Sequence, residues 1–445
     1  MAGQIGMAGR GGESRAGGDF LLKRHGTGFE DWVMLEKLRD RISPRTLVLI
    51  LLGLATAVKT LWAVTSSGTC DPMLFYFFGK AMQHRSMATL YEGGAIYNHT
   101  PLTGWLAHQL CNVTHDYYPT FAAILRIACI LADVGVVLGL LYVRKLTGKP
   151  PYWALCLFAA SPVSIMVSGF HGNIDPIMVM FLFFAAVAVL KDKPVLSGVM
   201  FALACNIKIV PIMVAPVFIF YWIARGRRAA LYFMGTSGTL MLAGASWALV
   251  NCPVAFIRNV FGYGSIWGGW GITYWLRQTG IRAFHLMSYA DLSVEQNRVI
   301  TLLKAILLAG VFVLAWRRRK LGGLEFFTTL GAAFTWIFVF MPGSAAQYMV
   351  WYAPFLLLLS PEWWAVITTG ATIFLARFYH STSGYNFPWI IALPRTAQDF
   401  YWAPATNLPW GGFIALLLCR WAPWFLLEKP PRPVEAAAEP AVEAA

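Results

Sequence analysis

Apolar runs close to the length of a membrane span recur along the whole chain, and they restrict its fold more than any other feature. A helix needs about 20 consecutive apolar residues to cross a bilayer. Only 13% of the 445 residues are charged and 58% are hydrophobic, whereas soluble domains carry about 25% charged residues. Backbone groups inside lipid must pair within their own segment, so such runs form helices. We therefore expect an all-α, polytopic membrane protein with about 11–13 transmembrane helices and further helices in its external loops.

The formal net charge of +14 raises the question of nucleic acid binding, but the distribution of basic residues argues for a membrane. Lys and Arg concentrate in alternate connections between the apolar runs, as they do where basic loops stay in the cytoplasm. The basic residues of these connections lie in the segment 1–45, in Arg144 to Lys149, at Lys191 and Lys193, in Arg225 to Arg228, in Arg317 to Lys320, and at Lys429 and Arg432. The pattern predicts that both termini are cytoplasmic and that no nucleic acid is bound.

Three parts of the chain differ in composition. Residues 1–45 form a polar arm, in which 29–42 has the spacing of an interfacial amphipathic helix. Residues 46–427 hold the apolar runs, and the polar stretch 67–119 after the first run forms the first outer loop. Residues 428–445 are rich in Pro, Ala and Glu, a composition typical of disorder. We expect a cytoplasmic arm, a transmembrane domain and a disordered cytoplasmic tail, in a bacterial inner membrane or an endoplasmic-reticulum membrane.

Residues 195–224 are apolar but contain Asn206, Lys208 and two prolines. The segment is too long for one crossing and too short for two complete ones. We therefore expect a hairpin of short helices whose irregular tip lies at membrane depth, where such a backbone must line a cavity. A single ammonium at this depth needs an anion. The phosphate of a lipid carrier would supply one, and a carboxylate such as Asp133 or Asp175 is the alternative.

The predicted topology places few carboxylates where an external general base could lie. They are Asp71, Glu92, Asp116, Asp291, Glu295 and Asp399 on outer loops, and Asp175 at the outer mouth of its helix. Asp71 is the best placed, because it lies at the water–lipid boundary just after the first apolar run. A lipid-borne phosphate and a polar acceptor could both reach it there. The alternative is an acid that only marks a helix boundary before Pro72.

Further polar residues are candidates for binding a substrate. They are Tyr97, His99, His171, Asn173, Asp175, Gln347 and Tyr348. Tyr97 and His99 can stack on or hydrogen-bond a sugar, with an ordinary turn as the alternative. His171 and Asn173 directly precede Asp175, where an acid in the first turn of a helix is favourable in any case. Gln347 and Tyr348 begin a late apolar run, and the alternative for them is an ordinary polar turn.

Charged residues inside the apolar runs are costly, so each is a candidate for a functional role. Arg126 and Asp133 share a face of one predicted helix, and we expect them to brace the helix bundle rather than to take part in chemistry. Lys59 and Lys304 are expected to reach toward the interface or to pair with acids.

Several familiar motifs are absent. The chain has no Walker A, HExxH or CxxC motif, and its first outer loop has no DxD pair. No metal site or other cofactor is therefore demanded, although a divalent cation would be compatible with the site. Cys70 and Cys111 both lie in the first outer loop, where they could form a disulfide or remain thiols.

The order of these features resembles the GT-C superfamily of membrane glycosyltransferases, which use polyprenyl-phosphate-linked sugars. The resemblance covers residues 46–360. Its landmarks are Asp71, LYEGGAIYNHTPLTGWL, LRIACILADVGVVLGLLY, GFHGNIDPIMV, ACNIKIVPIMVAPV and AAQYMVWYAPFLLLL. Members of that superfamily often carry two acids in the first loop, whereas this chain has one near the membrane.

The resemblance implies an inverting transfer of a hexose-like sugar, of mannose or glucose type, from a polyprenyl phosphate such as dolichol phosphate. The acceptor would be a glycan, lipid or protein on the non-cytoplasmic face. Asp71 would be the catalytic base, and Lys208 would bind the donor phosphate. Trp267, Trp270 and Tyr274 would form a lid or the wall of an opening to lipid. The alternative class is a polytopic transporter or lipid flippase, which also needs intramembrane charges and a broken helix.

Overall fold

The structure is a computed structural model that describes residues 42–93, 97–262, 266–285, 292–385, 387 and 402–425. The described residues from Leu47 onward form one compact unit. All regular elements in the described ranges are helices, which confirms the all-α prediction. The expected interfacial helix, most of the arm and the expected tail lie outside the described residues, as do Asp291 and Asp399.

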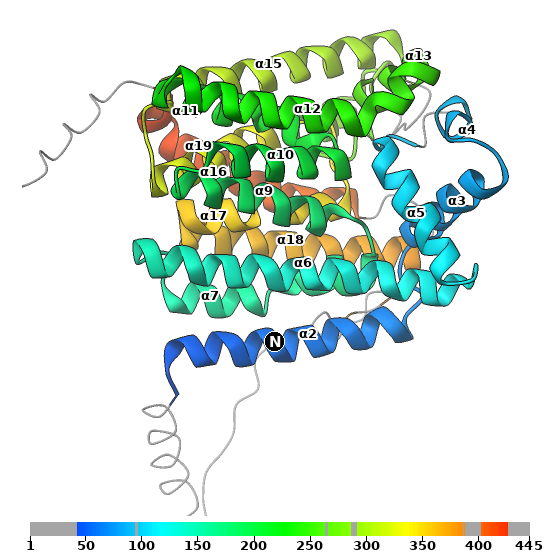
Figure 1. Cartoon of the computed structure of the whole chain (residues 1–445), viewed down its shortest axis with the longest axis horizontal. Coiled ribbons are helices and arrows are strands. Elements are labelled where there is room, and N and C mark those ends of the chain that lie inside the picture. The colour runs from blue at the N-terminus through cyan, green and yellow to red at the C-terminus, as the bar shows by residue number, and fades with distance from the viewer. Residues whose placement is uncertain are drawn as a thin grey trace, which may run out of the picture. The chain divides into compact units, whose positions relative to one another are not determined.

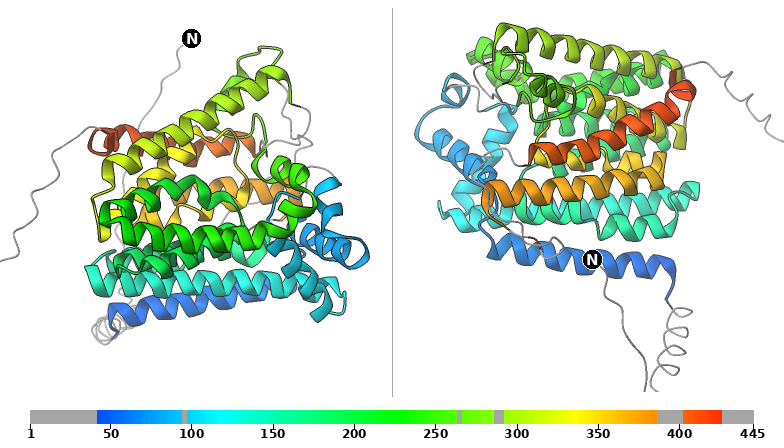
Figure 2. Two further views of the ribbon diagram at one scale, coloured as in Figure 1. Left: turned by 45° about the horizontal axis from the view of Figure 1, so that its top comes forward. Right: turned by 180° about the vertical axis from the view of Figure 1, so that it is seen from behind.

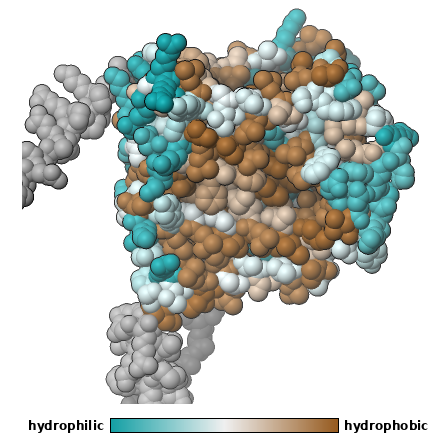
Figure 3. All heavy atoms as spheres, in the orientation of Figure 1, coloured by the Kyte–Doolittle hydropathy of each residue, from teal (hydrophilic) through white to brown (hydrophobic). Residues whose placement is uncertain are grey.

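Five helical segments are long and apolar enough to cross a membrane, judged by length and composition. They are α2 (Pro44–Thr65), α6 (Tyr118–Thr147), the run Tyr152–His171, α12 (Arg227–Asn251) and α15 (Val294–Arg318). In Figure 1 their axes run in roughly the same direction across the view, from α15 at the top to α2 at the bottom. Their outward faces are apolar, and Leu54 on α2 is 61% exposed. Figure 3 shows the result in one view, an apolar band between two hydrophilic ends.

Seven further helices complete this bundle in the described ranges. They are α9 (Asp175–Leu190), α10 (Pro194–Ile207), α11 (Ala215–Arg225), α16 (Leu324–Phe340), α17 (Ala353–Leu359), α18 (Pro361–Ser383) and α19 (Asn407–Phe425). Helices α18 and α19 lie next to each other (Figure 2). Helix α9 is apolar all round, and its side chains from Met178 to Val189 are mostly buried, as expected for a helix in the centre of a bundle.

The hairpin expected in residues 195–224 is present. Helix α10 ends at Ile207, Lys208 has an extended backbone, and a short 3-10 turn, η2 (Val210–Val214), leads into α11. Pro211 and Pro216 cannot continue an upstream helix because each lacks a backbone N–H. The broken helix predicted from these residues is therefore confirmed.

Three helices of the first polar loop pack together at one end of the bundle (Figure 1). They are α3 (Asp71–His84), α4 (Met87–Glu92) and α5 (Pro101–Val113). The Lys80 ammonium on α3 lies 2.7 Å from a carboxylate oxygen of Asp116, which follows α5. This ion pair joins the two ends of the loop. The amide of Asn259 donates to the carbonyl of Tyr91 over 2.7 Å and ties α4 to the neighbouring helix α13 (Pro253–Phe261). We call this the loop-helix end.

Helix α2 is attached to the bundle by buried charges. Lys59 donates to Asp133 over 2.7 Å and to Ser164 over 2.6 Å, so the predicted pairing of Lys59 is confirmed. Arg126 donates to the carbonyls of Ala63, Ser66 and Ser67 at 3.1, 2.9 and 2.8 Å. Arg126 and Asp133 thus brace the bundle, as expected from their shared face, but each does so with its own partners.

Candidate active site

Asp71 is the first residue of α3, where the exposed N–H groups of a helix favour a negative charge. Its Oδ2 atom accepts a hydrogen bond from the amide of Asn173 over 2.6 Å and lies 2.8 Å from Nε2 of His171. The side chain is 19% exposed, and its Oδ1 atom has no hydrogen-bond partner among the described residues. One oxygen is therefore fixed by the protein, and the other is open to a ligand.

A distorted helix carries His171 and Asn173 to this position. The run Ile165–His171 is a single π-helical turn, a feature often found at functional sites. It ends at Gly172, whose φ of +80° reverses the chain. A Cβ on Gly172 would lie 2.6 Å from Cγ of Pro72, so only glycine allows this turn to approach the start of α3. The Thr69 hydroxyl donates to the His171 carbonyl over 2.9 Å and holds the two segments together.

These contacts keep the Asp71 carboxylate charged. Burial alone would raise the pKa of Asp71 above its ordinary value of 3.8. The interaction with His171, the hydrogen bonds from His171 and Asn173, and the charge of Lys208 outweigh burial and lower this pKa to about 2. Asp71 is consequently an ionised acceptor at neutral pH.

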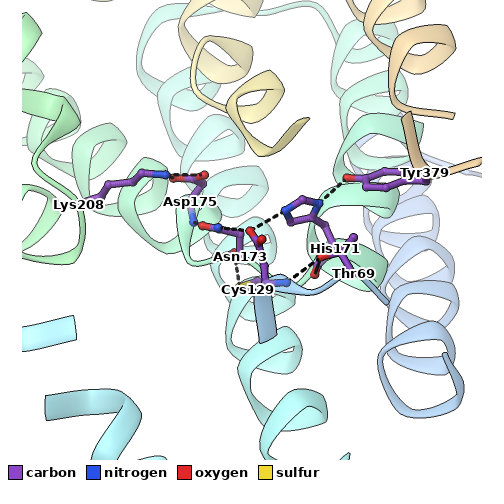
Figure 4. Close-up of polar contacts among 8 residues, drawn as sticks. Thr69, Cys129, His171, Asn173, Asp175, Lys208 and Tyr379 are labelled. Atoms are coloured by element: carbon purple, nitrogen blue, oxygen red, sulfur yellow. Dashed lines mark hydrogen bonds and ion pairs between the residues drawn. The ribbon is translucent and has the colours of Figure 1, made fainter. Parts of the chain in front are cut away.

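Asn173 connects Asp71 with a second acid, Asp175, and Figure 4 shows Asn173 beside Asp175. Its amide nitrogen donates to Asp71, while its Oδ1 accepts the backbone N–H of Asp175 over 3.3 Å. The Asp175 carboxylate is fully buried and binds the Lys208 ammonium at 2.8 and 3.1 Å. The expected carboxylate partner of Lys208 is therefore Asp175 rather than Asp133. The ammonium also lies 4.9 Å from the ring centre of Tyr348, a cation–π distance.

Two cavities meet at Lys208. The polar cavity, of about 110 Å³, is lined by Asp71, Leu74, Phe75, Phe78, Asn98, His99, Asn173, Lys208, Gln347 and Tyr348. The apolar cavity, of about 260 Å³, shares Asn98, Lys208 and Tyr348 with it and is otherwise lined mainly by aliphatic and aromatic side chains of η2, α13 and α15. Lys304, on α15, also lines the apolar cavity. A charged head group and a hydrocarbon chain of one lipid could thus lie on the two sides of Lys208.

The structure separates the predicted substrate residues into two layers. Asn173, His99, Gln347 and Tyr348 line the polar cavity. His171 and Asp175 lie behind it and are hydrogen-bonded to the lining residues Asp71 and Lys208. Tyr97 lies deeper still, with its hydroxyl donating to the carbonyl of Thr100 over 2.7 Å. A sugar contact for Tyr97 remains a prediction from the sequence alone.

His99 forms a neutral wall of the polar cavity. Burial, followed by the nearby charge of Lys208, lowers its pKa to about 3. Its Nδ1 atom is buried and has no hydrogen-bond partner among the described residues. An unpaired buried polar atom costs roughly 1–3 kcal/mol, and a hydroxyl of a bound substrate would remove that cost.

Two hydroxyls hold His99 beside Lys208. Thr100 donates to the carbonyl of Asn206, and Thr103 donates to the carbonyl of Ile207 over 2.8 Å. These carbonyls are at the C-terminus of α10, where helical partners are lacking because the helix is broken. Sequence reasoning missed both threonines, since their partners lie more than a hundred residues away. It also missed Tyr379, whose hydroxyl lies 3.0 Å from Nδ1 of His171.

Other expectations concern residues outside the cavities. Trp267 and Trp270 are fully buried, and their indole nitrogens donate to the carbonyls of Phe284 and Phe338 over 3.0 and 2.9 Å. These two residues anchor the segment before α14 (Gly271–Gln278), and neither lines the polar or the apolar cavity. Their role as a lid remains a prediction.

Cys70 and Cys111 are free thiols, so the disulfide considered for the first loop does not form in this structure. Within the ranges that the structure describes, no group of three His, Cys, Asp or Glu side chains could hold a metal ion.

The apolar helices and the polar cavity at one end of them are typical of a membrane protein. The sequence identifies its class, because the model of glycosyltransferase family 87, a membrane family of GT-C type, matches residues 115–342. The chain belongs to glycosyltransferase family 87. Among curated proteins, no sequence matches the chain. The matched segment includes His171, Asn173 and Lys208, whereas Asp71 precedes it.

Proposed function

We propose that the protein transfers a hexose-like sugar, of mannose or glucose type, from a polyprenyl phosphate to a hydroxyl of a glycan, lipid or protein acceptor. The reaction takes place on the non-cytoplasmic face, at the loop-helix end, with both termini in the cytoplasm of a bacterium or of a cell with an endoplasmic reticulum. One observation carries the proposal. Lys208 lines both an apolar cavity and a polar cavity, and Asp71 also lines the polar cavity.

The proposed reaction is a single inverting displacement. The acceptor hydroxyl attacks the anomeric carbon, and Oδ1 of Asp71 takes up the hydroxyl proton. The bond between the anomeric carbon and the phosphate oxygen breaks on the opposite side, and the polyprenyl phosphate leaves with the electron pair. Lys208 stabilises the charge on this leaving group as a fixed cation. The low pKa of Asp71 keeps the carboxylate deprotonated before the reaction.

The Asp71→Asn variant tests the proposed base. Asparagine keeps the shape of the side chain and removes the proton acceptor, and general-base catalysis is worth roughly 10²–10⁴-fold. We expect the rate of sugar transfer from synthetic polyprenyl-phosphate sugars to fall by about this factor, with little change in expression or thermal unfolding. The matched control is Asp116→Asn, an acid of the same loop that pairs with Lys80 and is 42% exposed.

A well-folded Asp71→Asn variant with wild-type activity would exclude the proposed mechanism. Equal losses in Asp71→Asn and Asp116→Asn would also count against it, because the effect would then concern the loop rather than the base. A donor panel with mannose and glucose on the same phosphate carrier decides the sugar in the same assay.

A further inference from the structure

A hydrogen-bonded chain extends from Asp71 into the core of the bundle, and Figure 4 shows its other two members, His171 and Tyr379. Nε2 of His171 lies 2.8 Å from Oδ2 of Asp71, and Nδ1 of the same ring lies 3.0 Å from the hydroxyl of Tyr379. Tyr379 is on α18 and is completely buried. Its ring packs against Phe170 and Phe387, at centroid distances of 5.2 and 5.8 Å. The hydroxyl is thus held in one place by apolar neighbours.

The protons of this chain can be assigned from its partners. An ionised carboxylate can only accept hydrogen bonds, so the Nε2 atom that faces Asp71 must carry a proton. The Tyr379 hydroxyl has Nδ1 of His171 as its single hydrogen-bond partner among the described residues. A buried O–H group donates where an acceptor is available, so Tyr379 donates to Nδ1. In this arrangement Nε2 of His171 donates to Asp71, and Nδ1 accepts from Tyr379.

We propose that Tyr379 is a positioning residue of this active site: it fixes the tautomer of His171 that donates to Oδ2 of Asp71 and so leaves Oδ1 as the proton acceptor. With the other tautomer, a lone pair of His171 would face the carboxylate and repel it. The inference rests on the function proposed above. It adds that His171 cannot itself be the base, since its lone pair faces Tyr379 and not the cavity.

A double-mutant cycle tests whether Tyr379 acts through His171. Tyr379→Phe removes only the hydroxyl, and His171→Gln keeps an N–H donor for Asp71 that needs no partner at Nδ1. We expect Tyr379→Phe to lower kcat about tenfold, the effect of losing roughly one hydrogen bond, with the donor KM unchanged. In the His171→Gln background, the same change should lower kcat by less than about twofold, because coupled residues are not additive.

Tyr385→Phe is the matched control. Tyr385 belongs to the same aromatic cluster, with its ring 4.6 Å from that of Phe170, and no hydrogen bond joins it to His171. This variant should keep the wild-type kcat. NMR of protein labelled with ¹⁵N-histidine gives a direct readout, and His171→Gln assigns the signal. The wild type should show a protonated Nε2 and an unprotonated Nδ1 at His171, and Tyr379→Phe should show a second tautomer.

Several results would overturn the inference. They are a protonated Nδ1 in the wild type, an unchanged tautomer in Tyr379→Phe, equal activity of Tyr379→Phe and Tyr385→Phe, and additive effects in the cycle. The wild-type spectrum decides the matter even if Tyr379→Phe does not fold. An active Asp71→Asn variant would instead exclude Asp71 as the proposed base, and a wild-type protein that transfers no sugar would exclude the proposed function, so these failures can be told apart.

Discussion

Lys208 shows how a single residue can meet two demands. A buried ammonium needs a counter-charge at all times, and Asp175 supplies it at 2.8 Å. The same ammonium lines both cavities, where it can interact with a phosphate that enters. The sequence offered two alternative partners for Lys208, a carboxylate of the protein or the phosphate of a lipid carrier. The structure is compatible with both.

Lys208→Met should weaken donor binding. The change removes the one lysine among the described residues that line the polar cavity and keeps most of the side-chain volume. We expect the donor KM to rise at least about tenfold, in line with the 1.5–3 kcal/mol of a hydrogen bond to a charged group. The measurement is the initial rate of transfer at varied donor concentration.

Asp175→Asn separates the two roles of Lys208. It breaks the same ion pair but leaves the ammonium in place, so the donor KM should rise less than in Lys208→Met. If both variants raise the donor KM equally, Lys208 has a structural role only.

Much of this site could be predicted residue by residue. Asp71, His171, Asn173 and Lys208 were singled out because the predicted topology placed polar groups at one membrane face, and the structure brings them together. Tyr379 could not be found in this way. A tyrosine in an apolar helix is ordinary, and only the fold places its hydroxyl beside His171.

Among the elements, the turn after the π-helical run shapes the site most directly. Gly172→Ala places a Cβ against Pro72 and imposes a φ of +80° on alanine, and a left-handed backbone costs roughly 1–2 kcal/mol for residues other than glycine. We expect a lower melting temperature and a loss of most activity, because His171 and Asn173 must move. Thermal unfolding in detergent and kcat measure the two effects.

Gly148→Ala is the control for backbone strain. Its φ is +76°, but a Cβ there would meet nothing within 4 Å. This variant should lose stability and keep its kcat. If the two alanine variants have equal kcat values, the close approach at Gly172 does not matter for catalysis.

Element boundaries followed from the sequence where proline and polar residues interrupt apolar runs, as in the break at Lys208. The π-helical turn could not be predicted in this way. It packs closely against α2 at Gly169, where a Cβ would lie 2.9 Å from Cα of Lys59. Close contacts of this kind are properties of the folded bundle and have no counterpart in a local sequence pattern.

At the scale of the whole molecule, the basic connections lie opposite the loop-helix end. They follow α6, α9, α11 and α15, whose last turns or caps carry Arg144, Lys191, Arg225 and Arg318. The membrane orientation proposed above predicts which end is accessible from outside. Single cysteines at Arg85 and Lys193, in a background without the exposed Cys70 and Cys419, test it in intact cells.

Arg85→Cys should react with a membrane-impermeant maleimide, and Lys193→Cys should react only after permeabilisation. Both positions are exposed, so each serves as the accessibility control for the other. The reverse labelling pattern would overturn the orientation and, with it, the proposed location of the reaction.

The brace between α2 and α6 has a consequence for biosynthesis. Helices gain little from apolar contact with each other in lipid, and a lysine at the centre of a helix costs roughly 2.5–3.5 kcal/mol on insertion scales. The partner of Lys59 is Asp133, 74 residues later in the chain. Because α2 is synthesised before α6, we expect Lys59 to lack this partner until α6 is made, and we expect α6 to complete the insertion of α2.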